Sequence, residues 1–124
     1  MAKKVLVIDD EPDIGLLLEA RISSKGYDVL VAQDGLEGLE RAAKEQPALI
    51  ILDILMPRMD GHQVLKQLKS QPETKNIPVI GLTASVATTH MGTFIAEGGV
   101  DCLTKPFEPV ELLDKITKVI GAAT

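Results

Sequence analysis

The sequence predicts an α/β fold, a doubly wound sheet of five parallel strands in the order 2-1-3-4-5 with five helices. Short runs of β-branched residues and leucine recur five times along the 124 residues, and a segment with a 3.6-residue apolar period follows each run. The runs are apolar almost throughout, which is typical of parallel strands that helices bury on both faces. In this order the chain reverses direction between the first and third strands, and a crevice opens beyond their carboxyl ends.

Each strand is predicted by a short apolar run between turn residues. The runs, in chain order, are Val5–Ile8, Val29–Val31, Leu49–Leu52, Val79–Leu82 and, as the weakest, Val100–Leu103. Glycines lie in most of the joints between these runs and the helical segments. No linker or long repeat interrupts the alternation, so residues 1–124 are expected to form one domain.

Each intervening helix is expected to present one apolar face to the sheet. These faces consist of Ile14, Leu17, Leu18 and Ile22 in the first helix, Leu36, Leu39 and Ala43 in the second, Val64, Leu65 and Leu68 in the third, Met91, Phe94 and Ile95 in the fourth, and Leu112, Leu113, Ile116, Val119 and Ile120 in the fifth. Pro109 suits the first turn of the fifth helix. Gly61 is expected to take a positive φ before the third.

Composition excludes several classes of protein. The chain carries 13 Lys and Arg against 18 Asp and Glu, a net charge of −5, with scattered lysines and only three aromatic residues, so nucleic-acid binding is not expected. The longest apolar run, 48–52, is too short to span a membrane, and no signal peptide is recognisable, so we expect a cytoplasmic protein. A lone Cys102 allows no internal disulfide, and His62 and His90, without partners at ligand spacing, are expected at the surface.

Polar residues capable of chemistry follow four of the five predicted strands. Asp9 and Asp10 follow the first strand, Asp53 the third, Thr83 the fourth and Lys105 the fifth. Each alone has an ordinary structural explanation, since an acidic pair before a helix is usually an N-cap. These four strands adjoin one another in the proposed sheet, however, and sites in such folds lie at the carboxyl ends of strands. A functional site is therefore predicted at this edge.

Three converging carboxylates predict a site for a hard divalent cation. They would repel one another and raise the pKa of at least one of them unless a cation lies among them. Mg²⁺ suits oxygen ligands of this kind, with Asp10 and Asp53 expected as direct ligands. Asp53 can then act as a nucleophile toward a phosphoryl group. Lys105 can pair with the carboxylate before the reaction and with the phosphoryl group afterwards, and the Thr83 hydroxyl can donate to a phosphoryl oxygen.

Four segments together carry a resemblance to a known family. They are Asp9–Pro12, Asp53–Gly61, Thr83–Ala84 and Lys105–Phe107. The Asp-x-x-Met-Pro-x-Met-Asp-Gly string, with Thr83 and Lys105 following at their spacing, resembles the receiver domain of two-component response regulators, and the resemblance covers nearly the whole chain.

The resemblance implies a phosphorylation-activated switch rather than an enzyme. Asp53 would accept a phosphoryl group from a histidine kinase or a histidine phosphotransfer protein, and Mg²⁺ would be held by Asp10, Asp53 and the backbone carbonyl of Leu55, with Asp9 acting largely through water. Thr83 and Lys105 would contact the phosphoryl oxygens and relay the change to the face of the fourth helix, fifth strand and fifth helix. The family also implies a cis peptide before Pro106, and an output through a protein partner or through an effector domain missing from this chain.

The chain departs from the family at Cys102, three residues before Lys105. The family usually has an aromatic residue there whose ring turns inward on phosphorylation. Cys102 is too small for that movement, so we expect it to be an inert core residue. Coupling would then rest on Thr83 and the loop that follows it alone, or the output face would rearrange less than in other receivers.

Two other functions were considered. An Asp-nucleophile phosphatase of the haloacid dehalogenase type needs a second Asp two residues after the nucleophile, where this chain has Leu55. A flavodoxin-like cofactor carrier would present hydroxyls and glycine amides in its first loop, where this chain has Asp9, Asp10 and Glu11. Both are disfavoured.

Overall fold

Five parallel strands form one sheet in the predicted order, β2-β1-β3-β4-β5. The computed structural model describes residues 2–54, 56, 60–83 and 88–124, without the side chains of 88–91. The strands are β1 (Lys4–Ile8), β2 (Asp28–Ala32), β3 (Leu49–Asp53), β4 (Val79–Thr83) and β5 (Asp101–Thr104). Every residue of β3 and β4 is buried, as the continuous apolar runs predicted for central parallel strands.

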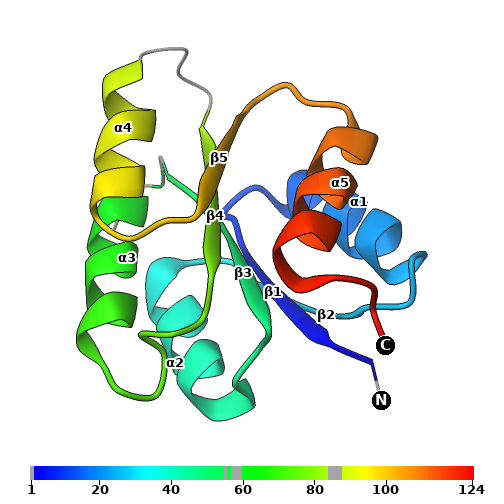
Figure 1. Cartoon of the computed structure of the whole chain (residues 1–124), viewed down its shortest axis with the longest axis horizontal. Coiled ribbons are helices and arrows are strands. Elements are labelled where there is room, and N and C mark those ends of the chain that lie inside the picture. The colour runs from blue at the N-terminus through cyan, green and yellow to red at the C-terminus, as the bar shows by residue number, and fades with distance from the viewer. Residues whose placement is uncertain (1, 55, 57–59, 84–87) are drawn as a thin grey trace.

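Helices cover both faces of the sheet (Figure 1). On one face lie α1 (Pro12–Ser23) and α5 (Pro109–Ile120), and on the other lie α2 (Gly35–Glu45), α3 (Gly61–Ser70) and α4 (Thr88–Ala96). Two separate apolar clusters result, one on each side of the sheet. The strands are parallel, so every crossover returns the chain to the side of the sheet where the strands begin. All five strands therefore end together on the opposite side, the carboxyl edge of the sheet.

Caps and prolines fix where the helices begin. Asp34 accepts a hydrogen bond from the Glu37 amide at the start of α2, 2.8 Å. Asp60 and Gln63 form a reciprocal capping box at the start of α3, with distances of 3.0 and 3.1 Å. Proline occupies the first turn of both α1 and α5. The third helix therefore begins at a fixed point just beyond the end of β3.

Several predicted core residues are exposed instead. Leu17, Leu36 and Ile95 are 42%, 64% and 45% exposed, and Ala43 is exposed as well. In α2 the buried stripe is Gly35, Gly38 and Ala42. Such small residues let a helix approach the sheet closely and turn its larger apolar side chains toward solvent.

The last strand also differs from its predicted range. It runs from Asp101 to Thr104, whereas Val100, the first residue of the predicted run, precedes it and is 48% exposed. Asp53 and Thr83 are the final residues of β3 and β4 rather than the residues that follow them. These shifts of one residue leave the predicted side chains at the same edge of the sheet.

Candidate functional site

The carboxyl edge of the sheet brings together the side chains that follow or end four strands. Thr83 pairs with Thr104 in the β4–β5 ladder, and the Lys105 amide donates to the Thr83 carbonyl at 2.7 Å. Asp53 pairs with Leu82 of β4. This backbone pairing fixes where Asp53, Thr83 and Lys105 leave the sheet, so the prediction of one shared edge is confirmed.

Three carboxylates converge at this edge, as predicted. Asp9, Asp10 and Asp53 each offer one oxygen, and the three oxygens lie within 4.8 Å of one another. Asp9 and Asp53 are 1% and 3% exposed, whereas Asp10 is half-buried. An all-oxygen, strongly anionic donor set with one partly open side fits a hard cation such as Mg²⁺.

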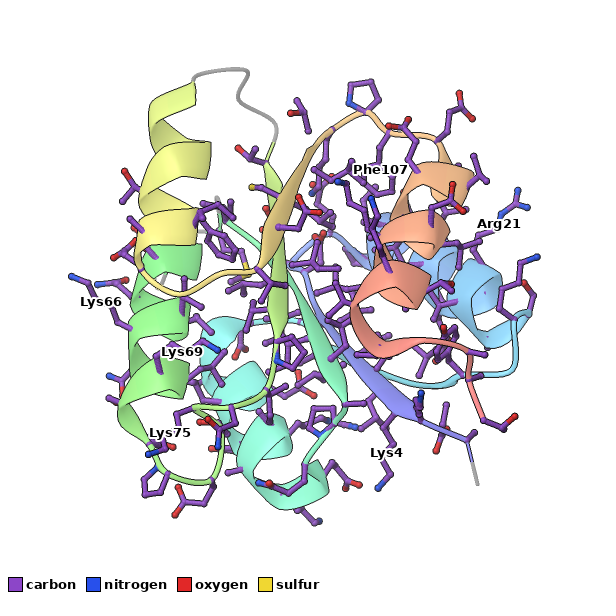
Figure 2. The ribbon with its side chains drawn as sticks, in the orientation of Figure 1. Lys4, Arg21, Lys66, Lys69, Lys75 and Phe107 are labelled. Carbon is purple, nitrogen blue, oxygen red and sulfur yellow. The ribbon has the colours of Figure 1, made fainter. Side chains whose placement is uncertain are left out.

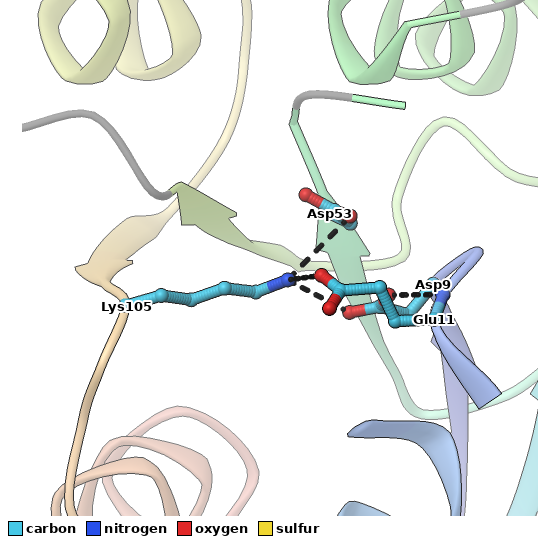
Figure 3. A network of polar contacts seen from close by, with 4 residues as sticks. All are labelled: Asp9, Glu11, Asp53 and Lys105. Atoms are coloured by element: carbon cyan, nitrogen blue, oxygen red, sulfur yellow. Dashed lines mark hydrogen bonds and ion pairs between the residues drawn. The ribbon is translucent and has the colours of Figure 1, made fainter. Parts of the chain in front are cut away.

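The Lys105 ammonium lies among the carboxylates of Asp9 and Glu11, which come from the turn between β1 and α1, and that of Asp53 at the end of β3 (Figure 3). Its Nζ is 3.2 Å from Asp9 Oδ2, 3.2 Å from Glu11 Oε1 and 3.5 Å from Asp53 Oδ2. The Lys105 side chain is 14% exposed, and that of Asp9 is fully buried. The lysine therefore supplies the cation that these carboxylates need in the absence of metal.

The electrostatics of the pocket correct one expectation. Burial raises the pKa of Asp9, and this effect outweighs the lowering caused by the Glu11 amide and by Lys105. Loss of water is thus the main cause of the raised pKa of Asp9, and repulsion by the Glu11 carboxylate adds to it. Burial lowers the pKa of Lys105, but the charges of Asp9 and Asp53, together with the hydrogen bonds that Lys105 donates to Glu11 and Asp9, overcome this effect and leave the pKa raised.

Local backbone structure holds the acidic residues in place. Asp9 Oδ1 accepts a hydrogen bond from the Glu11 amide at 2.9 Å, which tightens the turn between β1 and α1. Beyond Asp53, the Gly61 amide donates to the Ile54 carbonyl at 2.7 Å. A Cβ on Gly61 would lie 2.5 Å from Ile54 Cα. Gly61 does not have the expected positive φ, so its role is to allow this close approach.

Thr83 and Cys102 lie deeper in the same part of the sheet. Thr83 is fully buried at the end of β4. Cys102 pairs with Gly81 of β4 and is 6% exposed, and burial raises the pKa of its thiol. The structure thus agrees with the expectation of an inert core cysteine. The predicted ligand carbonyl of Leu55 and the loop 84–87 after Thr83 lie outside the described residues.

Two contacts, one at the site and one between α3 and the end of α4, were not predicted from the sequence. Glu11 belongs to the acidic first loop and to the motif segment Asp9–Pro12, from which no contact was predicted, yet it pairs with Lys105, 94 residues away in sequence. His62 was expected to be an isolated surface residue, yet its Nδ1 lies 2.7 Å from Glu97 Oε1, and its side chain is 20% exposed. The side chain of His90 lies outside the described residues. No local pattern signals either pair, because each joins segments far apart in the sequence.

The family follows from comparison with known proteins. The family model described as response regulator receiver domain matches residues 5–117. The chain belongs to this family. A receiver domain is a signalling switch of a two-component system, so the family assignment favours that reading over the phosphatase and the cofactor carrier. The Lys105–Pro106 peptide of this receiver is cis, as the resemblance implied.

Curated relatives are longer than this receiver. The alkaline phosphatase synthesis transcriptional regulatory protein PhoP of Bacillus subtilis is 39% identical over 120 residues, which are 97% of this chain and 49% of PhoP. The response regulator PleD of Caulobacter vibrioides is 38% identical over 94% of this chain and 26% of PleD. The receiver thus spans about half the length of the first of these relatives.

Solved structures match the fold closely. Chemotaxis protein CheY4 of Vibrio cholerae has a TM-score of 0.91 at 33% identity, covering 96% of this chain and 99% of that one. The receiver domain of sensor histidine kinase PA1611 from Pseudomonas aeruginosa has a TM-score of 0.89 at 27% identity, covering 98% and 100%, and its structure holds a magnesium ion coordinated in the active site cleft. Among the described residues of our receiver, no helix combines the length and apolar character needed to cross a membrane.

Proposed function

We propose that this receiver is a phosphorylation-activated switch in which Asp53 accepts the phosphoryl group. The observation that carries the proposal is the buried carboxylate of Asp53 at the end of β3, 3.5 Å from the Lys105 ammonium and close to two further carboxylates. The donor is a phosphohistidine of a histidine kinase or a histidine phosphotransfer protein. The domain comprises residues 1–124, works in the cytoplasm and does not bind nucleic acid.

The transfer forms one bond and breaks another. A carboxylate oxygen of Asp53 attacks the phosphorus atom, and the phosphorus–nitrogen bond to the donor histidine breaks with its electron pair remaining on the imidazole nitrogen. Lys105 offsets the negative charge that accumulates on the phosphoryl oxygens, since a nearby ammonium stabilises developing anionic charge. The Thr83 hydroxyl donates a hydrogen bond to one of these oxygens.

The donor set of the pocket fits the Mg²⁺ on which we propose the reaction depends. Asp10, Asp53 and the Leu55 carbonyl would hold the ion directly, and Asp9 largely through water. When bound, the ion offsets carboxylate repulsion and the charge of the transferring group. The buried position of Asp9 and Asp53 supports this assignment, because buried carboxylates need nearby positive charge.

Signalling follows from the change in charge at Asp53. A phosphoryl group adds about −1.5 to −2 charges and three strong acceptor oxygens. Thr83 and Lys105 respond, and because they end β4 and follow β5 they pass the change to the face formed by α4, β5 and α5. That face then binds a downstream protein partner or an effector domain. Cys102 contributes no ring to this movement.

Mass spectrometry after incubation with acetyl phosphate and Mg²⁺ tests the assignment. We expect a single adduct of about 80 Da on the wild type, the mass of one phosphoryl group. The adduct should be absent from Asp53→Ala and unchanged in Asp13→Ala, a matched removal of a carboxylate from the exposed first turn of α1. An equal adduct on Asp53→Ala would rule out Asp53 as the acceptor.

A further inference from the structure

The side chain of Glu11 occupies the start of α1 but does not cap that helix. Glu11 is the N-cap residue, with extended backbone angles of φ −91° and ψ 109°, and its side chain accepts no hydrogen bond from the first turn. Capping residues normally satisfy a free helix amide in this position. The Glu11 carboxylate instead reaches across the pocket to Lys105 (Figure 3). Its presence is thus better explained by the lysine than by the helix.

Glu11 shares one ammonium group with Asp9 and Asp53. An ammonium has three N–H donors and no acceptor. Lys105 Nζ lies 3.2 Å from Asp9 and 3.2 Å from Glu11, but 3.5 Å from Asp53, at the limit of a hydrogen bond. The residue that receives the phosphoryl group is therefore the most distant of the three partners.

Phosphorylation draws the Lys105 ammonium toward Asp53 and so lengthens its contact with another partner. Three new acceptor oxygens at Asp53 need donors, and they attract the ammonium toward them. The Asp9 side chain is fully buried, so losing its cation would leave a carboxylate without water or partner. The Glu11 side chain is 58% exposed and regains water at once when released. Breaking the pair with Glu11 therefore costs least.

We propose that Glu11 is a positioning residue that holds Lys105 away from Asp53 before phosphorylation and is the partner that Lys105 releases afterwards. This inference rests on the proposed role of Asp53 as the phosphoryl acceptor. Glu11 thereby opposes phosphorylation to a small, fixed extent, which slows the reaction at every concentration of donor.

Three variants separate this role from a general effect of charge. Glu11→Gln removes the charge and the ion pair, Glu11→Asp keeps the charge but shortens the reach by one methylene, and Glu19→Gln removes an exposed charge on the same helix that has no ion pair to Lys105. The rate of adduct formation is measured against acetyl phosphate concentration at saturating Mg²⁺. In this reaction acetate leaves with the electron pair of the phosphorus–oxygen bond.

We expect the maximal rate to rise about 1.5- to 5-fold in both Glu11 variants, which is the range for loss of an exposed ion pair, and to stay unchanged in Glu19→Gln. The half-saturating donor concentration should not change in Glu11→Asp, because the charge that the donor meets is retained.

In Mg²⁺-free, unphosphorylated protein, the effects of Glu11→Gln and Lys105→Met on the urea midpoint should be non-additive.

The contrary outcomes are distinguishable. A wild-type rate in Glu11→Gln, or a rise in Glu11→Gln that Glu11→Asp does not share, would overturn the role of Glu11 alone. Additive effects on the urea midpoint would do the same. Absence of the adduct from the wild type and all variants would overturn the proposed function and this inference with it.

Discussion

The ammonium of Lys105 faces the carboxylates of Asp9, Glu11 and Asp53, which come from two different segments of the chain. Each of these carboxylates would be costly to keep charged beside the others without a cation. The ammonium of one lysine, on the loop after β5, thus stabilises the charges of three carboxylates at once. Any event that moves this ammonium changes the surroundings of all three.

The thiol of Cys102 should react slowly while the receiver is folded. Burial raises its pKa above the ordinary value of 9.0, so less thiolate is present at pH 8 than on an exposed cysteine. We expect alkylation by iodoacetamide at pH 8 to be about tenfold or more slower in buffer than in denaturing urea.

Because the unfolded thiol ionises at lower pH than the folded one, the free energy of unfolding should fall as pH rises past 9.0.

Labelling is followed by mass spectrometry, with Cys102→Ser as the unreactive control. Native labelling as fast as that in urea would mean that the β5 backbone opens readily and that Cys102 is not part of a closed core.

The site was largely predictable from single residues at strand ends. Asp9, Asp53, Thr83 and Lys105 lie where parallel strands end, and this rule needs only the strand order. The contact of Glu11 was not predictable, because its direction depends on the turn after Asp9. The pairing of His62 with Glu97 depends in the same way on how α3 and α4 pack.

At the scale of elements, the packing of α3 against the end of β3 depends on Gly61. An added methyl group would lie 2.5 Å from Ile54 Cα and 2.7 Å from the Asp53 carbonyl oxygen, both backbone atoms that cannot turn away. We expect Gly61→Ala to lower the free energy of unfolding by about 1–3 kcal/mol, the usual cost of overpacking. Since the helix would move away from Asp53, phosphorylation should slow as well.

Gly92, within α4, is the matched control. A Cβ there meets no atom of the described part of the chain within 4 Å, so Gly92→Ala should stabilise the receiver by up to about 1 kcal/mol through helix propensity. Urea denaturation measures both variants. Equal stability of Gly61→Ala and the wild type would show that α3 can shift without cost.

The order of the elements was predictable, whereas the orientation of some helices was not. Alternating apolar runs and helical periods determine the parallel sheet, because right-handed crossovers leave few arrangements. In α2, Gly38 lies against Ile8 so closely that an added Cβ would be 2.5 Å from it. A pattern of large apolar residues cannot identify a face built from glycine, which is why Leu36 was placed on the wrong side.

At the scale of the whole molecule, the net charge of −5 is unevenly distributed. The buried acids Asp9 and Asp53 lie at the carboxyl edge of the sheet, while Lys4 begins β1 at the opposite edge. Figure 2 shows Lys66, Lys69 and Lys75 on and after α3. The acidic group best suited to a cation is that of Asp9, Asp10 and Asp53, because one oxygen from each lies within 4.8 Å of the others.

Mg²⁺ should therefore stabilise the folded receiver. At ten times its Kd, a ligand that binds only the folded state adds about 1.4 kcal/mol to the free energy of unfolding. We expect the Tm to rise with MgCl₂ beyond any effect of NaCl at equal ionic strength, and the rise to be lost in Asp10→Asn but kept in Asp13→Asn. The same rise in Asp10→Asn would show that Mg²⁺ acts elsewhere on the surface.

The two ends of the chain lie side by side (Figure 1), joined by a hydrogen bond of 2.8 Å from the Lys3 amide to the Ala123 carbonyl. Both lie at the edge where the strands begin, because α5 returns the chain to that edge. A protein module fused to either end would therefore lie at the edge where the strands begin. The acidic pocket at the opposite edge would stay accessible to a phosphoryl donor. A structural change at Asp53 would have to be transmitted along the full length of the strands, or through the flanking helices, to affect that module.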